Sequence, residues 1–323
     1  MRRLGLWIVI AGLAGLALVA GSFVGGWFMP GPLAAKKTVV VPSGATLWTV
    51  ARDLRAKGVI RSADGFVARA RILGGSAPIK AGEYAIPKGA SNRDILAILQ
   101  SGRVIHHMIT IPEGMPSILV QERLLAAREL TGPVAVPAEG SVLPDSYAFQ
   151  KGESRTAVLG RMQAAMKDYL AKAWAQRSGR TVVKTPEQAI ILASIVEKET
   201  AIAAERPIVA GVYGNRLRQG IMLQADPTII YPITRGKPLG RRILRSEITA
   251  VNGYNTYAMT GLPEGPIANP GRTSIDAVLN PAETKAIFFV ADGKGGHIFS
   301  ETLEQQNENV RKWFEIRRQR GEM

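Results

Sequence analysis

The segment ASIVEKET (193–200) contains two glutamates whose type and spacing could support acid–base chemistry. The apolar residues Leu192, Ile195 and Val196 recur at helical spacing, and continuing that stripe by three or four residues leads to Glu199. A carboxyl group on an apolar helix face has its ionised form disfavoured, so its pKa rises and it can serve as a general acid near neutral pH. The periodicity therefore predicts Glu199 as a catalytic acid.

A structural role for Glu199 is the alternative, in which it forms an ion pair with Arg206 or Arg216 in a seam between two helices. Glu197 lies two positions before Glu199, about 200° around the helix, and is predicted to be a solvated or capping side chain. An error in the helix register would exchange the two glutamates, so Glu197 also stays among the candidate substrate-binding residues.

Cleavage of a glycosidic bond is one reaction open to such an acid. The usual arrangement uses a pair of carboxyl groups, and Asp145, Asp226 and Asp292 are the candidates for the second one. A single acid also suffices if it first protonates the leaving oxygen. As a carboxylate it then removes a proton from the sugar's own C6 hydroxyl, which leaves an internal anhydro ring and consumes no water.

The composition excludes several other classes of site. The chain has no cysteine, which rules out thiolate nucleophiles, cysteine-ligated zinc and iron–sulfur clusters. Its three histidines are too few to favour a multi-histidine metal site. The glycine cluster GKGG (293–296) is best interpreted as a hairpin turn rather than a phosphate-binding loop. We therefore expect neither a metal nor a cofactor.

The net charge of +15, from 41 basic and 26 acidic residues, favours a polyanionic neighbour. Nucleic acid is a weak candidate, because the basic residues are spread along the chain and no recognition motif is present. An anionic membrane face and an acidic cell-wall polymer remain the favoured neighbours.

Strong local signals predict the helix that carries the two glutamates. Thr185 to Gln188 form a capping box with Pro186 at the first helical position, and the helix is expected to run through 187–205. Pro207 should end it near Arg206 and open a second helix over 207–219. The other expected elements are a loop over 131–140, a helix over 156–177, strands at 286–291 and 297–300, and a helix over 301–320.

The start of the chain has the composition of a membrane anchor. Leu4 to Phe28 include no charged residue, and a helix of that length would be about 37 Å long, enough to cross a bilayer. Trp7 and Trp27 would lie at the two interfaces, and the preceding Arg2 and Arg3 favour a cytoplasmic N-terminus. A cleaved signal peptide is the alternative, but the apolar run is too long for one.

A Pro-x-Gly unit occurs three times after this segment. VVVPSGATLWTVARDL, YAIPKGASNRDILAIL and ITIPEGMPSILVQERL each place a short apolar run, a Pro-x-Gly turn and a helical pattern in the same order. Proline ends the strand and glycine reverses the chain, so each copy is predicted to be a strand, a turn and a helix.

Four long blocks resemble the endolytic murein transglycosylases, the MltG or YceG-like family. They are ASIVEKET (193–200), NRLRQGIMLQADPTIIY (215–231), YNTYAMTGLPEGPIANPG (254–271) and FFVADGKGGHIF (288–299). The resemblance extends to the N-terminal helix and to EGSVLPDSYAF (139–149). It implies an α+β fold: a cytoplasmic stub and transmembrane helix over 1–28, a linker over 29–37, a LysM-like module over 38–104 and a catalytic domain over 105–323.

The resemblance also implies the activity. Members of this family cleave nascent peptidoglycan strands between N-acetylmuramic acid and N-acetylglucosamine and leave 1,6-anhydro ends, and the second glutamate of EKE, here Glu199, is their catalytic acid. It further implies an inner-membrane location, a periplasmic catalytic domain and penicillin-binding synthases as neighbours. The cleft residues carried over with less weight are Gln224, Asp226, Asn255, Thr256 and Tyr257.

Each of those cleft residues has a structural alternative. Asp226 could cap a turn before Pro227, and Asn255 could hold a loop backbone. Two other functions are also left open. The first is a non-catalytic, membrane-anchored scaffold that binds peptidoglycan and recruits synthases, and the second is a muramidase that uses water.

Overall fold

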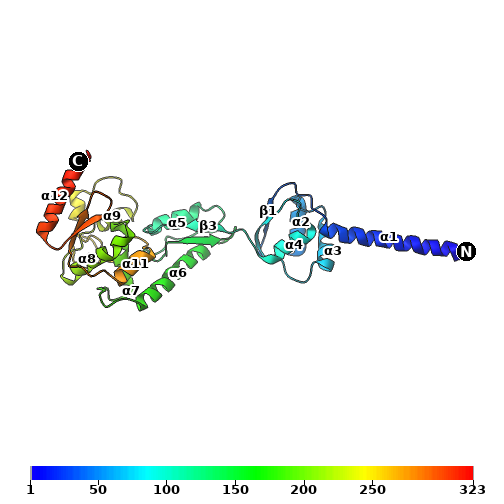
Figure 1. Cartoon of the computed structure of the whole chain (residues 1–323), viewed down its shortest axis with the longest axis horizontal. Helices are drawn as coiled ribbons and strands as arrows, with labels where there is room; N and C mark the ends of the chain where they lie inside the picture. Colours follow the sequence, from blue (N-terminus) through cyan, green and yellow to red (C-terminus); the bar gives the residue numbers. More distant parts are fainter. Residues whose placement is uncertain (1, 323) are drawn as a thin grey trace. The chain divides into compact units, whose positions relative to one another are not determined.

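Helices and short strand pairs alternate along the chain in a computed structural model that describes residues 2–322 (Figure 1). This confirms the mixed α+β class that the sequence predicts. The chain divides into two compact units. The first contains the residues up to 107 together with 148–152, and the second contains 108–147 together with the residues from 153 onward.

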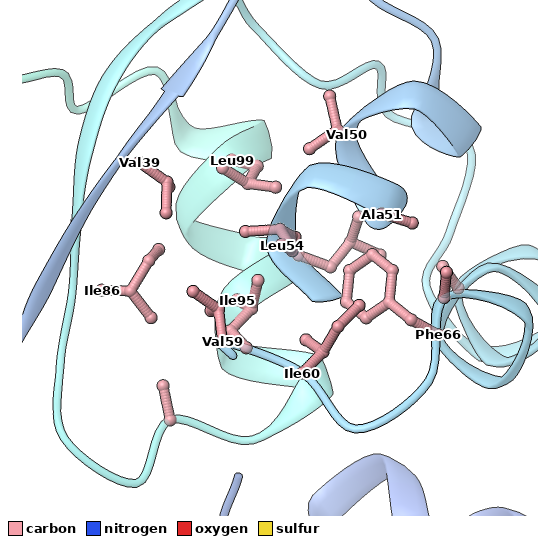
Figure 2. Close-up of a cluster of buried hydrophobic side chains, with 14 of the residues drawn as sticks. Val39, Val50, Ala51, Leu54, Val59, Ile60, Phe66, Ile86, Ile95 and Leu99 are labelled. Atoms are coloured by element: carbon pink, nitrogen blue, oxygen red, sulfur yellow. The ribbon is translucent and has the colours of Figure 1, made fainter. Parts of the chain in front are cut away.

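The first unit is built around a two-stranded antiparallel sheet in which Val39 lies opposite Tyr84. Side chains from both strands and from four helices meet in one apolar core, part of which is shown in Figure 2, where Leu54, Phe66 and Leu99 are buried. The elements of this unit are α1 (Arg2–Phe28), β1 (Lys37–Val41), α2 (Leu47–Ala56), α3 (Ala63–Leu73), β2 (Gly82–Ile86) and α4 (Asn92–Ser101). The LysM-like assignment of residues 38–104 stays a prediction.

The three Pro-x-Gly units form the strand, turn and helix that the sequence predicts. The strands and helices are β1 with α2, β2 with α4, and β3 (His107–Thr110) with α5 (Ser117–Ala126). Their turn glycines, Gly44, Gly89 and Gly114, all have a positive φ. In each turn the residue after the glycine donates its N–H to the proline carbonyl, and these bonds are Ala45 to Pro42, Ala90 to Pro87 and Met115 to Pro112. One local sequence rule thus produces the same turn three times.

The helix α1 is compatible with a membrane anchor. Its stretch Ile10–Phe28 is long and apolar enough to cross a bilayer, and the large side chains Leu13, Leu16 and Leu18 are exposed. The side chains of Arg2 and Arg3, which favour a cytoplasmic N-terminus, lie outside the described residues.

The C-terminal end of α1 is packed into the first unit. Trp27 is buried in that unit's core, so its predicted place at the membrane interface is wrong. The Phe23 carbonyl accepts a hydrogen bond from Nε of Arg69 at 2.8 Å, and the Gly26 carbonyl accepts one from Nδ2 of Asn92 at 2.9 Å. The indole finds a better partner in the apolar core than at a headgroup layer.

The segment after α1 is also attached to the first unit. Gly31 donates its N–H to the Gly89 carbonyl at 3.1 Å, and Gly89 donates to the Leu33 carbonyl at 3.0 Å. Leu33 is itself buried. The residues expected to form a linker therefore pack against the turn of the second Pro-x-Gly unit.

The core of the second unit surrounds α7, whose residues from Ala189 to Val196 are almost all buried. The predicted hairpin is confirmed, with Phe288 opposite Ser300. The remaining elements are β4 (Ser146–Phe149), which pairs with β3, α6 (Arg155–Ala175), α7 (Pro186–Glu199), η1 (Ala203–Glu205), α8 (Arg206–Arg218), α9 (Asp226–Thr234), α10 (Arg245–Ile248), α11 (Arg272–Leu279), β5 (Phe288–Ala291), β6 (His297–Ser300) and α12 (Leu303–Gln319).

The helix α7 begins as predicted but ends earlier. The Thr185 hydroxyl accepts the N–H of Gln188 at its start, whereas Thr200 adopts an extended conformation at its end. The Thr200 hydroxyl donates to Oε2 of Glu205 at 2.8 Å, and Glu205 in turn is bonded to His297. These tertiary contacts replace helical hydrogen bonds, so the expected end near Arg206 is wrong and Glu199 is the last residue of α7.

Candidate active site

A cavity of about 340 Å³ opens at the end of α7 in the second unit. Six segments meet there: the end of α7, the middle of α8, the start of α9 with the residues before it, the loop after α10, β5 and the first turn of α12. The residues that line it are Glu199, Tyr213, Arg216, Leu223, Gln224, Asp226, Tyr257, Phe288, Phe289 and Gln306.

Glu199 is partly buried in this cavity, and its carboxyl group is the main candidate for acid–base chemistry. Burial raises its pKa to about 7, and the nearby Asp226 adds to the rise, whereas hydrogen bonding by Tyr213 and the charge of Arg216 oppose it. Its Oε1 atom is buried and has no hydrogen-bond partner among the described residues. A carboxyl group in this state can hold a proton near neutral pH and is free to deliver it.

The ion pair considered as a structural role for Glu199 does not form. Within residues 2–322 no basic side chain lies within salt-bridge distance of its carboxyl group. Arg216 donates instead to backbone carbonyls, at 2.6 Å to Ile287 and 2.8 Å to Leu223. Arg206 is paired with Glu197. Arg216 therefore supplies positive charge at the edge of the cavity without neutralising Glu199 directly.

Asp226 is the second carboxyl group of the cavity. It occupies the first position of α9, and the hydroxyl of Tyr257 donates a hydrogen bond to its Oδ1 at 2.7 Å. The other two aspartates lie elsewhere: Asp145 is paired with Arg272 at 2.8 Å, and Asp292 accepts backbone N–H groups inside the β5–β6 turn. Of the three candidates for a second carboxylate, only Asp226 lines the cavity with Glu199.

Gln224 also lines the cavity, in a conformation that non-glycine residues rarely adopt. Its φ is 53°, and its N–H donates to the Thr256 carbonyl at 3.1 Å. Its side-chain oxygen accepts a hydrogen bond from Nη1 of Arg216 at 3.4 Å. A strained backbone next to Glu199 is typical of a functional site.

Asn255 and Thr256 are fully buried and do not line the cavity. The amide of Asn255 donates to three carbonyls, those of Glu247, Ile248 and Ala250. The Thr256 hydroxyl accepts the N–H of Ala225 at 3.0 Å, just before α9. A side chain without exposed surface cannot contact a sugar, so these two residues hold the loop that carries Tyr257, as the structural alternative for Asn255 anticipated.

Glu197 is buried as well, so the prediction of a solvated side chain is wrong. Its Oε1 pairs with Nη2 of Arg206 at 2.9 Å, and its Oε2 accepts the N–H of Gly271 at 2.9 Å. Its side chain is 4% exposed and that of Arg206 is 7% exposed. The pair joins α7, α8 and the start of α11, and Glu197 does not line the cavity. A substrate-binding role for Glu197 therefore has no geometric support.

Sequence reasoning missed five side chains of the cavity: Tyr213, Leu223, Phe288, Phe289 and Gln306. Tyr213 precedes Arg216 by three residues on α8, so helical spacing could have placed the two on one face. The two phenylalanines lie in a predicted strand, and nothing local marks Gln306. Within residues 2–322 no cluster of three or more His, Asp or Glu side chains could hold a metal ion.

Comparisons with known proteins agree on one family. The sequence profile of the YceG-like family matches residues 39–312. An endolytic murein transglycosylase from Bacillus subtilis (strain 168) is 26% identical over 333 residues, which cover 92% of this chain and 91% of that protein. One from Streptococcus pneumoniae (serotype 2, strain D39) is 27% identical, and the match covers 94% of this chain but 64% of the relative. A crystal structure of a YceG-like protein from Listeria monocytogenes has 25% identity and a TM-score of 0.53, covering 85% of this chain and 98% of that one.

Proposed function

The chain belongs to the YceG-like family, and from this premise we propose that it is an endolytic murein transglycosylase, a lyase that cleaves peptidoglycan strands with Glu199 as its acid. The bond it breaks joins N-acetylmuramic acid to N-acetylglucosamine. The observation that carries the proposal is the carboxyl group of Glu199, which has a raised pKa and an unpaired Oε1 at a cavity that also holds Asp226.

The proposed reaction has two proton transfers, both at Glu199. In the first, the protonated carboxyl group gives its proton to the glycosidic oxygen, and the bond from that oxygen to the anomeric carbon breaks. In the second, the Glu199 carboxylate removes the proton of the C6 hydroxyl on the same muramic acid ring. That oxygen then bonds to the anomeric carbon and closes the 1,6-anhydro ring, so Glu199 regains its proton and no water is consumed.

The surroundings of Glu199 suit a group that must exist in both protonation states. Burial favours the acid before the first transfer, and the charge of Arg216 together with hydrogen bonding by Tyr213 favours the carboxylate after it. Asp226 places a second negative charge near the anomeric carbon, where positive charge develops as the bond breaks.

The pH dependence of cleavage is expected to follow the protonation of Glu199. Because the free enzyme needs the acid form and the pKa is about 7, kcat/KM should fall above neutral pH, approaching tenfold per pH unit. The measurement is kcat/KM on solubilised glycan strands between pH 5 and 9. Asp145→Asn, which alters an ion pair outside the cavity, should keep the same profile. A flat profile from pH 6 to 9 would rule out Glu199 as the acid.

Product analysis separates the proposed function from its two rivals. The full-length chain in detergent is incubated with peptidoglycan, and the new ends are identified by mass spectrometry. Anhydro ends support the proposal, whereas reducing ends would identify a muramidase that uses water. Binding to peptidoglycan without new ends of either kind would identify a scaffold.

We further propose that α1 anchors the protein in the inner membrane as a single span, with the second unit on the periplasmic side beside penicillin-binding glycan synthases. The apolar composition of Ile10–Phe28 and the net charge of +15 support a membrane and a polyanionic polymer as neighbours. Protease digestion of intact spheroplasts tests the orientation, because a periplasmic second unit should be degraded while the membrane stays closed.

A further inference from the structure

A second cavity of about 420 Å³ lies in the second unit, at the other end of α9 from Glu199. The carboxyl group of Glu139 and the rings of Tyr231 and Tyr254 form part of its wall. Arg235, Gly253 and Glu264 also line it. The acid–base chemistry described above uses none of them.

Two segments of chain line both cavities. The helix α9 contributes Asp226 to the first cavity and Tyr231 to the second. The loop that follows α10 contributes Tyr257 to the first cavity and Tyr254 to the second. A nine-residue helix is about 13 Å long, which exceeds the size of a single sugar ring but is short compared with a glycan strand. Tyr231 follows Asp226 by five positions, about 140° around the helix, so a strand that occupies both cavities must pass around α9 rather than along one face of it.

The backbone is strained at both ends of α9. Gln224, just before the helix, has a φ of 53°, and Arg235, just after it, has a φ of 54°. Among the described residues these are the only non-glycine residues with a positive φ. Gln224 lines the first cavity and Arg235 lines the second. Glycine would relieve this strain at either position, and both positions instead carry a polar side chain that lines a cavity.

The polar groups of the second cavity are arranged to bind hydroxyl and amide groups. Glu139 accepts hydrogen bonds from the N–H of Ser117 at 2.9 Å and from the hydroxyl of Tyr231 at 3.2 Å, which fix its carboxyl group at the cavity wall. The guanidinium of Arg235 forms no ion pair with a described carboxylate. A Cβ on Gly253 would overlap the carboxylate of Glu264, so glycine allows that group to lie close to the loop backbone.

The charge and shape of the cavity select a neutral ligand rich in hydroxyl groups. One arginine faces two carboxyl groups, so neither a polyanion nor an apolar ligand is favoured. The rings of Tyr231 and Tyr254 lie 4.8 Å apart at an angle of 48°, and an aromatic surface of this kind can pack against the apolar face of a sugar ring. Burial raises the pKa of Glu139, which weakens the negative charge of the site further.

We propose that this second cavity binds a neutral N-acetylglucosamine ring of the same glycan strand that is cleaved beside Glu199, at a position away from the broken bond. The inference rests on the proposed function, because it takes the strand as the ligand. It explains how an enzyme that cuts within strands could hold a long strand more tightly than a short fragment.

Strand-length dependence of binding tests the proposal. The full-length Glu199→Gln chain in detergent is titrated with peptide-free glycan strands of defined length and with a single N-acetylglucosamine–N-acetylmuramic acid disaccharide. Adding Tyr254→Ala should reduce the ratio of long-strand to disaccharide affinity by about tenfold. Phe314→Ala is the matched control, because it removes an exposed aromatic ring of the same unit that lines neither cavity, and the ratio should not change.

A second variant separates binding from folding. Arg235→Gly removes the guanidinium and places glycine at a left-handed helix C-terminus, where glycine is preferred, so the melting temperature should stay the same or rise. Long-strand affinity should nevertheless fall severalfold. If both Arg235→Gly and Tyr254→Ala leave the affinity ratio unchanged, the second cavity does not hold the strand.

The outcomes for the two proposals can be distinguished. Formation of anhydro ends by the chain with Glu199 intact tests the proposed function, whatever the second cavity binds. The affinity ratio is measured without cleavage and tests only the second cavity. Cleavage with an unchanged ratio would overturn the inference alone, whereas the absence of cleavage would overturn the proposed function.

Discussion

Replacing Glu199 by glutamine should reduce glycan cleavage by at least about a thousandfold, because the amide has nearly the same shape but cannot deliver a proton as an acid. The measurement is the rate of appearance of anhydro ends from peptidoglycan. Glu122→Gln, which alters an exposed glutamate paired with Lys237, is the matched control and should cleave normally. A Glu199→Gln chain that still cleaves at a substantial fraction of the normal rate would remove the basis of the mechanism.

The same variant should be more stable than the parent chain above neutral pH. The pKa of Glu199 is raised from 4.5 to about 7 on folding, mainly by burial. Between these values the unfolded chain releases the proton and the folded chain keeps it, so the folded state loses stability as pH rises, on the order of 3 kcal/mol in total. Glutamine has no proton to lose. The stability difference between the two chains should therefore grow from pH 4.5 to 7 and then level off.

Thermal unfolding of both chains at several pH values measures this pH-dependent difference in stability. If Glu199→Gln is less stable than the parent at every pH, the carboxyl group of Glu199 stabilises the folded state. Activity loss would then have a structural cause, and the assignment of Glu199 as the acid would need other evidence.

Removing Glu197, the first glutamate of the EKE triplet, should instead destabilise the folded chain. Glu197→Ala is expected to lower the free energy of unfolding by about 3 kcal/mol, because it removes the buried carboxylate partner of Arg206. The remaining carboxylate contact of Arg206, Glu113 at 3.1 Å, is nearly half exposed and compensates only part of the loss. It also removes the acceptor for the Gly271 N–H at the start of α11. Thermal or urea unfolding of the full-length chain measures the effect.

An exposed ion pair provides the comparison for this prediction. Glu122 and Lys237 are 2.6 Å apart, with about half of each side chain exposed, and Glu122→Ala should change the free energy of unfolding by less than about 1 kcal/mol. An equally small effect for Glu197→Ala would contradict the structural role of the buried pair. It would also return Glu197 to the candidates for substrate contact.

The parts of the fold that local sequence determines were predictable. The three Pro-x-Gly turns each depend on a proline, a glycine and the hydrogen bond between neighbours three positions apart, so the pattern contains everything that the turn requires. The start of α7 is similar, because Thr185 and Pro186 act within one turn of helix. The place of Glu199 on the apolar stripe followed from helical spacing alone.

The parts that depend on distant residues were not predictable. The helix α7 ends where it does because Thr200 contacts Glu205, which is held by His297 from a hairpin far along the chain. Glu197 is buried because Arg206 and Gly271 lie against it. Asn255 and Thr256 lie in a segment whose sequence resembles the YceG-like family. Sequence similarity of a segment does not distinguish a side chain that faces the substrate from one that stabilises the loop.

The packed end of α1 has a mechanical consequence for a protein embedded in a bilayer. Trp27 and the hydrogen bonds of Arg69 and Asn92 join the helix to the first unit without a free hinge. Any tilt of the helix within the lipid must therefore rotate the first unit by the same angle. With the membrane anchoring proposed above, a bilayer thickness that changes the tilt would also change the orientation of the first unit relative to the membrane.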